Sequence, residues 1–142
     1  MSFLVVAAET ERVAMAEGIR VLLIDDDADF IQLNSIILAV EGFQVITASS
    51  YGEGLEKASK ERPAVVVMNV IVENSDQGFS LARDIHYELG DSVPVIMLSS
   101  VEMDTGYTFK PEDHPDYFPV HCFIEKPVSP TLLIEEITKA IS

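Results

Sequence analysis

The chain has 142 residues, of which 48% are hydrophobic, enough to form the core of one ordinary domain. Its formal charge of −15, from 24 acidic and 9 basic residues, repels phosphate backbones and anionic membranes, so we expect no nucleic-acid or membrane binding. Cys122 is the only cysteine, so the chain forms no internal disulfide, and we expect a small buried residue on a strand. The apolar segment 3–8 is too short to cross a bilayer and lacks a basic flank, which predicts a cytoplasmic protein.

Short apolar runs alternate with amphipathic stretches, a pattern typical of βαβ units and a parallel sheet. Residues 1–19 are expected to be an N-terminal extension, in which residues 1–14 precede a second methionine, Met15. A strand is predicted over 20–24 and a helix over 28–40, capped by Asp27 or Asp29. The apolar residues of this helix recur at helical spacing: Phe30, Leu33, Ile37 and Val40.

The second strand is predicted over 43–48, after Gly42, which ends the first helix. Apolar positions then mark a second helix that closes before Pro63, namely Tyr51, Leu55 and Ala58. The third strand is predicted over 64–68. A third helix ends at Gly90, and its apolar positions are Leu81, Ala82, Ile85 and Leu89.

The fourth strand is predicted over 93–98 and the fifth over 121–125. Between them, residues 102–120 contain three prolines and no sustained helical period, so no full helix is expected there. A last helix over 129–141 should place three residues inward: Leu133, Ile137 and Ile141. Residues 20–142 are therefore predicted to form a single domain with no additional output domain.

Polar residues follow the predicted strands at the edge where open α/β sheets bind ligands. They are Asp25, Asp26 and Asp27 after the first strand, Asn69 after the third, Ser99 and Ser100 after the fourth, and Lys126 after the fifth. Asp25 and Asp26 suit Mg²⁺, which prefers one or two carboxylates plus other oxygens. Ser99 and Lys126 could complement phosphoryl oxygens. The pattern thus indicates a site for a divalent cation and a phosphoryl group.

From about Arg20 to Ile141 the sequence resembles the receiver domain of two-component response regulators. The resemblance is carried by "VLLIDDDADF", "GFQVITASSYGEGLEKASKERPAVVVMN", "PVIMLSS" and "FIEKP". It implies a flavodoxin-like (βα)5 fold, a doubly wound parallel five-stranded sheet of order 2-1-3-4-5. It also implies a cis bond before Pro127 and these roles: Asp25 and Asp26 as the metal-binding pair, Ser99 as the switch hydroxyl, Phe123 as the switch aromatic and Lys126 as the family's lysine.

Asn69 stands where the resemblance places the aspartate that receivers phosphorylate. A carboxamide lacks the charged oxygen that attacks phosphorus, so no acyl phosphate can form on it. Loss of one carboxylate also weakens the demand for Mg²⁺, and Lys126 could pair with the aspartates instead. We therefore expect no cofactor, or at most weak Mg²⁺ binding.

The leading hypothesis is a stand-alone pseudo-receiver that acts by binding other proteins and is not an enzyme. Candidate partners are a sensor histidine kinase, another regulator or a larger cytosolic complex, and a homodimer through the last helix stays open. The alternative is a response regulator phosphorylated with Mg²⁺ on a substitute carboxylate, such as Asp76 or one of Asp25 to Asp27. A third hypothesis is an unrelated small α/β enzyme, although no glycine-rich phosphate loop follows the first strand.

One other group of residues has metal-binding side chains. It comprises Asp113, His114, Asp116, His121 and Cys122. Its spacing matches no standard site, and a loop followed by a strand residue is the simpler interpretation. His86 lies beside Ile85 in the third predicted helix, and we expect a surface or half-buried residue without a catalytic part.

Overall fold

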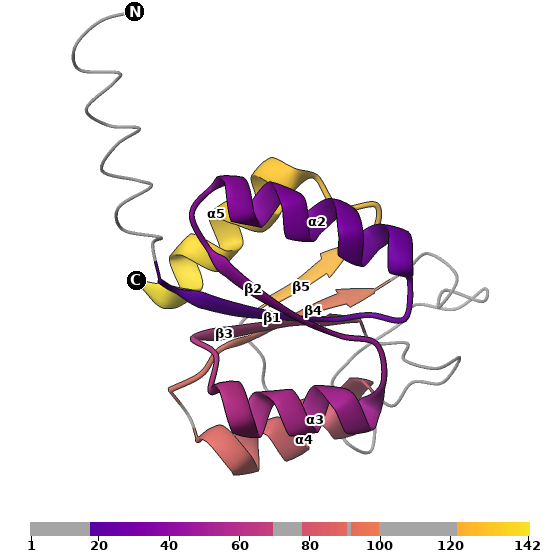
Figure 1. Cartoon of the computed structure of the whole chain (residues 1–142), viewed down its shortest axis with the longest axis vertical. Helices are drawn as coiled ribbons and strands as arrows, with labels where there is room; N and C mark the ends of the chain where they lie inside the picture. The colour runs from indigo at the N-terminus through magenta and orange to yellow at the C-terminus, as the bar shows by residue number, and fades with distance from the viewer. Residues whose placement is uncertain (1–17, 70–77, 91, 100–121) are drawn as a thin grey trace, which may run out of the picture.

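The computed structural model describes residues 18–69, 78–90, 92–99 and 122–142, and these contain a five-stranded sheet (Figure 1). All strand pairings are parallel, and the order is β2-β1-β3-β4-β5. The strands are β1 (Arg20–Ile24), β2 (Gln44–Ala48), β3 (Val65–Asn69), β4 (Val95–Ser99) and β5 (Cys122–Glu125). The predicted flavodoxin-like topology is confirmed.

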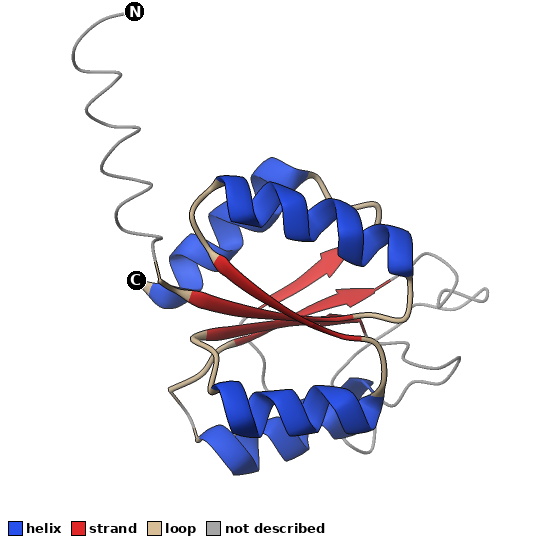
Figure 2. Ribbon diagram, viewed as in Figure 1, coloured by secondary structure: helices blue, strands red, loops and turns tan. Residues whose placement is uncertain are grey.

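Helices cover both faces of the sheet (Figure 2). On one face lie α2 (Ala28–Val40) and α5 (Pro130–Ile141). On the other lie α3 (Tyr51–Glu61) and α4 (Gly78–Leu89). None of the helices in the described ranges is long and apolar enough to cross a membrane.

The core consists of two layers, one on each side of the sheet, and the strands supply both. Within β1, Leu22 and Ile24 pack in the layer under α3 and α4, whereas Val21 and Leu23 pack in the layer under α2 and α5. All four are buried, as expected for a parallel strand covered by helices on both faces. This burial explains why the strands read as continuous apolar runs.

The apolar spacing in residues 28–40 predicts the bounds of α2 correctly, but it does not identify the side of the helix that is buried. Leu33 and Val40 are exposed, whereas Asn34 and Leu38 are buried. Asn34 is tolerated there because its Nδ2 donates a hydrogen bond to the Phe30 carbonyl oxygen at 2.9 Å. Since α2 carries apolar residues around much of its circumference, the period alone does not identify the side that faces the sheet.

Other local predictions are confirmed. Asp27 is the N-cap of α2, because its carboxylate accepts the amides of Asp29 and Phe30 at 3.0 and 3.2 Å. Leu133 and Ile137 of α5 are buried, and Ile141 is half-buried. The prediction for 102–120 lies outside the described residues.

Gly54 lets α3 approach the sheet and α4 closely. A Cβ at this position would lie 2.9 Å from Cδ1 of Ile24 and 3.3 Å from Cδ2 of Leu81. Gly52 in the same helix has no atom within 4 Å of an added Cβ. The packing of α3 therefore favours glycine at position 54, whereas position 52 has room for a side chain.

We predict that Gly54→Val lowers the free energy of unfolding by about 1–3 kcal/mol more than Gly52→Val, because only the first change overpacks the core. Both variants replace glycine by the same residue in one helix, so the difference isolates packing. Urea denaturation measures it, and equal stabilities would contradict the close packing of α3.

Candidate functional site

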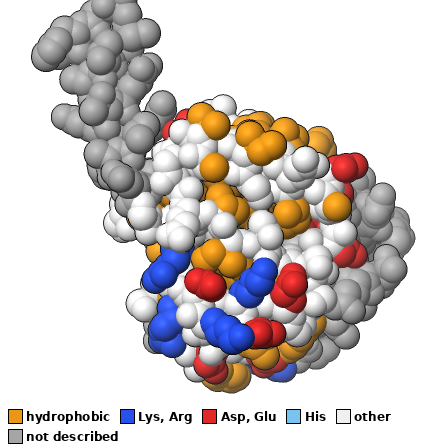
Figure 3. Space-filling model, in the orientation of Figure 1, with side chains coloured by type: hydrophobic (Ala, Val, Ile, Leu, Met, Phe, Trp, Pro, Cys, Tyr) orange, Lys and Arg blue, Asp and Glu red, His pale blue; other side chains and the backbone are white. Residues whose placement is uncertain are grey.

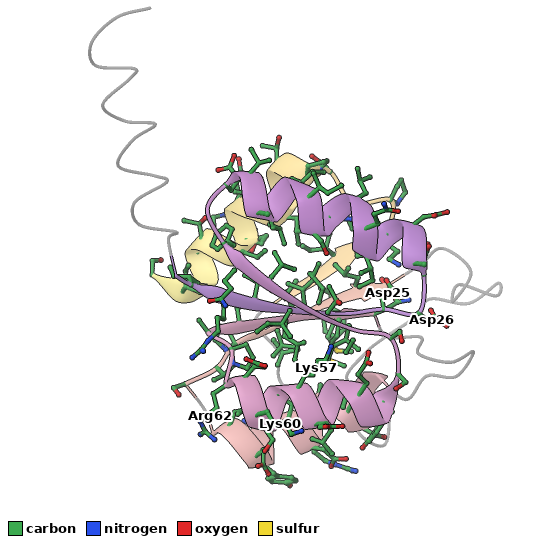
Figure 4. All side chains as sticks on the ribbon, viewed as in Figure 1. Asp25, Asp26, Lys57, Lys60 and Arg62 are labelled. Atoms are coloured by element: carbon green, nitrogen blue, oxygen red, sulfur yellow. The ribbon has the colours of Figure 1, made fainter. Side chains whose placement is uncertain are left out.

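The candidate site lies at the carboxyl ends of the strands, where Asp25 and Asp26 follow β1 (Figure 4). The Asp25 amide donates to the Ala48 carbonyl oxygen at 3.1 Å, which continues the β1–β2 pairing by one residue. The Asp25 side chain is only 1% exposed, and its Oδ1 accepts the Asp27 amide at 3.0 Å. Asp26 is exposed. The two neighbouring carboxylates therefore lie in very different environments.

Lys126 follows β5 and contacts the acidic pair through Asp25. Its amide donates to the Ser99 carbonyl oxygen at 2.7 Å, which fixes the residue beside the end of β4. Its Nζ donates to Asp25 Oδ2 at 2.6 Å. The Nζ also lies 4.3 Å from the centroid of the Phe30 ring, a favourable position for a cation over an aromatic face. Lys126 is thus held by both an anion and an aromatic ring.

Asn69 is the last residue of β3 and lies beside the acidic run. Ile24 of β1 pairs with Met68 of β3, so Asp25 and Asn69 occupy neighbouring positions at the ends of adjacent strands. Asn69 is 7% exposed, and its Oδ1 has no hydrogen-bond partner in the described part of the chain. A buried oxygen without a partner costs about 1–3 kcal/mol, so this atom is suited to accept a proton donor or a cation.

The structure places the remaining predicted residues around this edge. Ser99 ends β4 and is half-buried. Phe123 in β5 is half-buried and packs against the core layer under α3 and α4. The Lys126–Pro127 bond is cis, as predicted. Ser99 and Lys126, like Asp25, Asp26 and Asn69, belong to the carboxyl ends of four adjacent strands or to the segments that follow them, whereas Phe123 is the second residue of β5.

Other candidates are placed elsewhere or not described. His86 is half-buried on α4, as expected. Cys122 begins β5, but its side chain is outside the described residues, as are Asp76 and the group from Asp113 to His121. Within residues 18–69, 78–90, 92–99 and 122–142, no three His, Cys, Asp or Glu side chains gather as a possible metal site.

The residues present could hold Mg²⁺, but only in part. The unpartnered Asn69 Oδ1 and the Asp26 carboxylate are oxygen donors of the kind that Mg²⁺ prefers. Asp25, in contrast, already accepts the Lys126 ammonium on one oxygen and the Asp27 amide on the other. A bound cation would offset the negative charge of the acidic pair and so reduce its repulsion of an anionic ligand. The cation would compete with Lys126 for Asp25.

Sequence reasoning missed Phe30 as part of the site. The helical spacing predicts Phe30 only as an apolar position of the helix over 28–40. In the structure, the Lys126 ammonium lies over its ring. The available signal is position, because Phe30 lies in the first turn of α2 directly after the acidic run.

The comparisons with known proteins agree with this geometry. The family model for the response regulator receiver domain matches residues 21–138. Protein PilH of Pseudomonas aeruginosa is 26% identical over 125 residues, covering 87% of this chain and 98% of that protein. The probable transcriptional regulator ycf27 of Pyropia yezoensis is 29% identical over 126 residues, and this chain spans only 47% of its length.

Solved receiver structures share the fold. A CheY-like response regulator receiver domain protein from Methanospirillum hungatei superposes with a TM-score of 0.72 at 26% identity, covering 87% of this chain and 93% of that one. A response regulator receiver domain protein from Clostridium thermocellum gives a TM-score of 0.71 at 25% identity, covering 87% and 94%. The similarity therefore extends over most of the described sheet and its helices.

We predict that Lys126→Met lowers the free energy of unfolding by about 3 kcal/mol, because the buried Asp25 carboxylate loses its counter-ion. Asp25→Asn combined with Lys126→Met should recover part of this loss. The matched control is Lys139→Met, which removes an exposed lysine 3.5 Å from Glu136 and should cost less than about 1 kcal/mol. If urea denaturation gives the same loss of unfolding free energy for both lysine substitutions, the Asp25–Lys126 pair stabilises the fold no more than an exposed ion pair does.

Proposed function

The chain belongs to the response regulator receiver domain family, and we propose that it is a pseudo-receiver that signals by binding other proteins without aspartyl phosphorylation. The observation that carries this proposal is the buried amide of Asn69 at the end of β3, next to Asp25. We place its action in the cytosol and assign it no enzymatic turnover.

The chemical argument begins with the nucleophile. Transfer of a phosphoryl group to a side chain requires an oxygen with available negative charge, aligned with the leaving group. The Asn69 Oδ1 belongs to a neutral amide, and the amide nitrogen has a delocalised lone pair. Neither atom can form a stable bond to phosphorus, so position 69 cannot accept the group.

Lys126 supports the same conclusion, because its ammonium group already forms an ion pair with Asp25. Its Nζ lies 2.6 Å from Asp25 Oδ2 and over the Phe30 ring. In this arrangement the lysine balances the charge of Asp25, while the neighbouring Asp26 is exposed.

Weak Mg²⁺ binding follows from the same substitution. A carboxylate at position 69 would attract a divalent cation, and one unit-charge pair at ~4 Å with an effective dielectric near 20 is worth about 4 kcal/mol at most. The amide oxygen supplies only a dipole. We therefore propose that any Mg²⁺ site formed with Asp26 has low affinity.

The alternative, phosphorylation of a substitute carboxylate, has less support. Asp25 is buried and holds Lys126, and Asp27 caps α2. Asp26 is exposed, and exposure alone does not make it a nucleophile. Asp76 lies outside the described residues. The third hypothesis, an unrelated α/β enzyme, is wrong because the chain belongs to the receiver family.

The partner is proposed from the family and from charge. We propose that the chain docks on a sensor histidine kinase or another regulator, and that basic side chains on that protein complement the net charge of −15. A homodimer is a weaker proposal, because two copies carry the same large negative charge.

The wild-type chain, incubated with Mg²⁺ and acetyl phosphate, should show no mass gain of one phosphoryl group. Native mass spectrometry at neutral pH measures this, since acyl phosphates hydrolyse in acid or base. A receiver with aspartate at the acceptor position serves as a positive control. Stoichiometric uptake by the wild type would overturn the proposal, and peptide mapping would then identify the substitute carboxylate.

Asn69→Asp should become less stable than the wild type without Mg²⁺, because it adds a third carboxylate beside Asp25 and Asp26. Mg²⁺ at about 100 times its dissociation constant should then raise its free energy of unfolding by about 2.7 kcal/mol. Thermal unfolding with and without Mg²⁺ measures the difference. A wild-type Tm that rises with Mg²⁺ as much as that of the variant would contradict the weak site.

A further inference from the structure

The outer side of α2 carries an apolar stripe, defined here as Leu33, Ile36 and Val40. Their side chains are 58%, 57% and 74% exposed. Spacings of three and four residues place them on the same side of the helix. In Figure 3, hydrophobic side chains gather along the edge of the molecule where α2 runs. Contiguous exposed apolar surface of this kind usually marks a contact site.

A groove between α2 and α5 borders the stripe. Its lining begins at Glu41, the residue after Val40, and continues along α5. The α5 residues that line it are Thr131, Ile134, Glu135, Thr138 and Lys139. Stripe and groove adjoin where Val40 is followed by Glu41, at the carboxyl end of α2.

The chain enters the described structure beside this surface. The Ile19 carbonyl oxygen accepts the Gln44 amide at 2.8 Å, which places residues 18 and 19 beside the segment that follows α2. The Phe43 amide in turn donates to the Leu38 carbonyl oxygen at 3.1 Å. The segment before Gly18 is therefore attached close to the Val40 end of the stripe.

The sequence of residues 1–17 is suited to cover an apolar surface. It reads MSFLVVAAETERVAMAE, in which 11 of 17 residues are apolar. Such side chains are unfavourable in water, and so are the three of the stripe. The stripe spans eight residues of α2, about 10 Å, whereas 14 residues reach at least about 21 Å at the helical rise of 1.5 Å per residue, so the segment is long enough.

Attachment and charge favour this occupant over a second copy of the chain. A tethered segment meets its site at an effective concentration in the millimolar range. Two copies, in contrast, each carry a formal charge of −15 and repel one another. The intramolecular contact therefore needs little intrinsic affinity to be populated.

We propose that residues 3–16 pack on the α2 stripe and the adjoining groove of the same molecule. This contact covers the outer side of α2. The inference is independent of the chemistry at position 69.

The test attaches a nitroxide spin label to Ser2→Cys in a Cys122→Ala chain and compares the amide NMR intensities with those of the reduced label. The Leu33, Ile36 and Val40 amides should lose most of their intensity, whereas the Lys60 and Tyr87 amides on the opposite helices should keep theirs. Unchanged α2 amides would overturn the proposal. If Cys122→Ala does not fold, Cys122→Ser is the replacement background.

Two controls make the test specific. A mixture of ¹⁵N-labelled chain without spin label and spin-labelled chain without ¹⁵N should show no loss, and loss there would indicate a second copy instead. Leu33→Gln combined with Val40→Gln should abolish the intramolecular effect. Tyr87→Gln, an exposed change on α4, should leave it intact. Loss of the effect in the Tyr87 variant as well would also overturn the proposal.

Discussion

The ion pair between Lys126 Nζ and Asp25 Oδ2 joins residues 101 positions apart and closes the carboxyl edge of the sheet. Asp25 is buried after the first strand, and Lys126 reaches it from the loop after the last strand. A buried carboxylate is costly without a counter-ion, so the pair requires β1 and β5 to hold their ends in a fixed relation. The Phe30 ring adds a third support from α2.

We propose that this pair helps the edge of the sheet to accommodate an amide at position 69. In a site with three carboxylates, mutual repulsion favours a bound cation. Here the lysine neutralises one acid, the second is exposed to water, and the third position is an amide. The edge of the sheet keeps the topology of a receiver, and we propose that its electrostatic demand for Mg²⁺ and a phosphoryl group is reduced. This electrostatic argument supports the proposal that the chain acts by binding other proteins.

Much of the architecture could be predicted from the sequence, because it depends on local chemistry. Buried strands covered on both faces are continuous apolar runs, and Asp27 is an N-cap whose side chain accepts amides of the first helical turn. Asn69 and the aspartates could be assigned to one edge, because parallel strands end together there. The strand order followed from the family resemblance.

What could not be predicted depends on contacts between distant elements. The buried side of α2 is determined by the sheet and α5, so Leu33 and Val40 are exposed despite their helical spacing. The role of Phe30 depends on the position of the Lys126 ammonium, and Lys126 follows β5, far from Phe30 in the sequence. The hydrogen bond from the Tyr51 hydroxyl to the Asp84 carboxylate likewise forms between α3 and α4, which no local pattern relates.

The central claim is that position 69 cannot receive a phosphoryl group, and beryllium fluoride tests it most directly. With Mg²⁺, this compound mimics a phosphoryl group bound to a carboxylate, and ¹⁹F NMR detects the bound form. We predict that the wild-type chain gives only the signals of free fluoride species at concentrations that saturate a receiver with aspartate at this position. Bound-fluoride signals from the wild type would contradict the account.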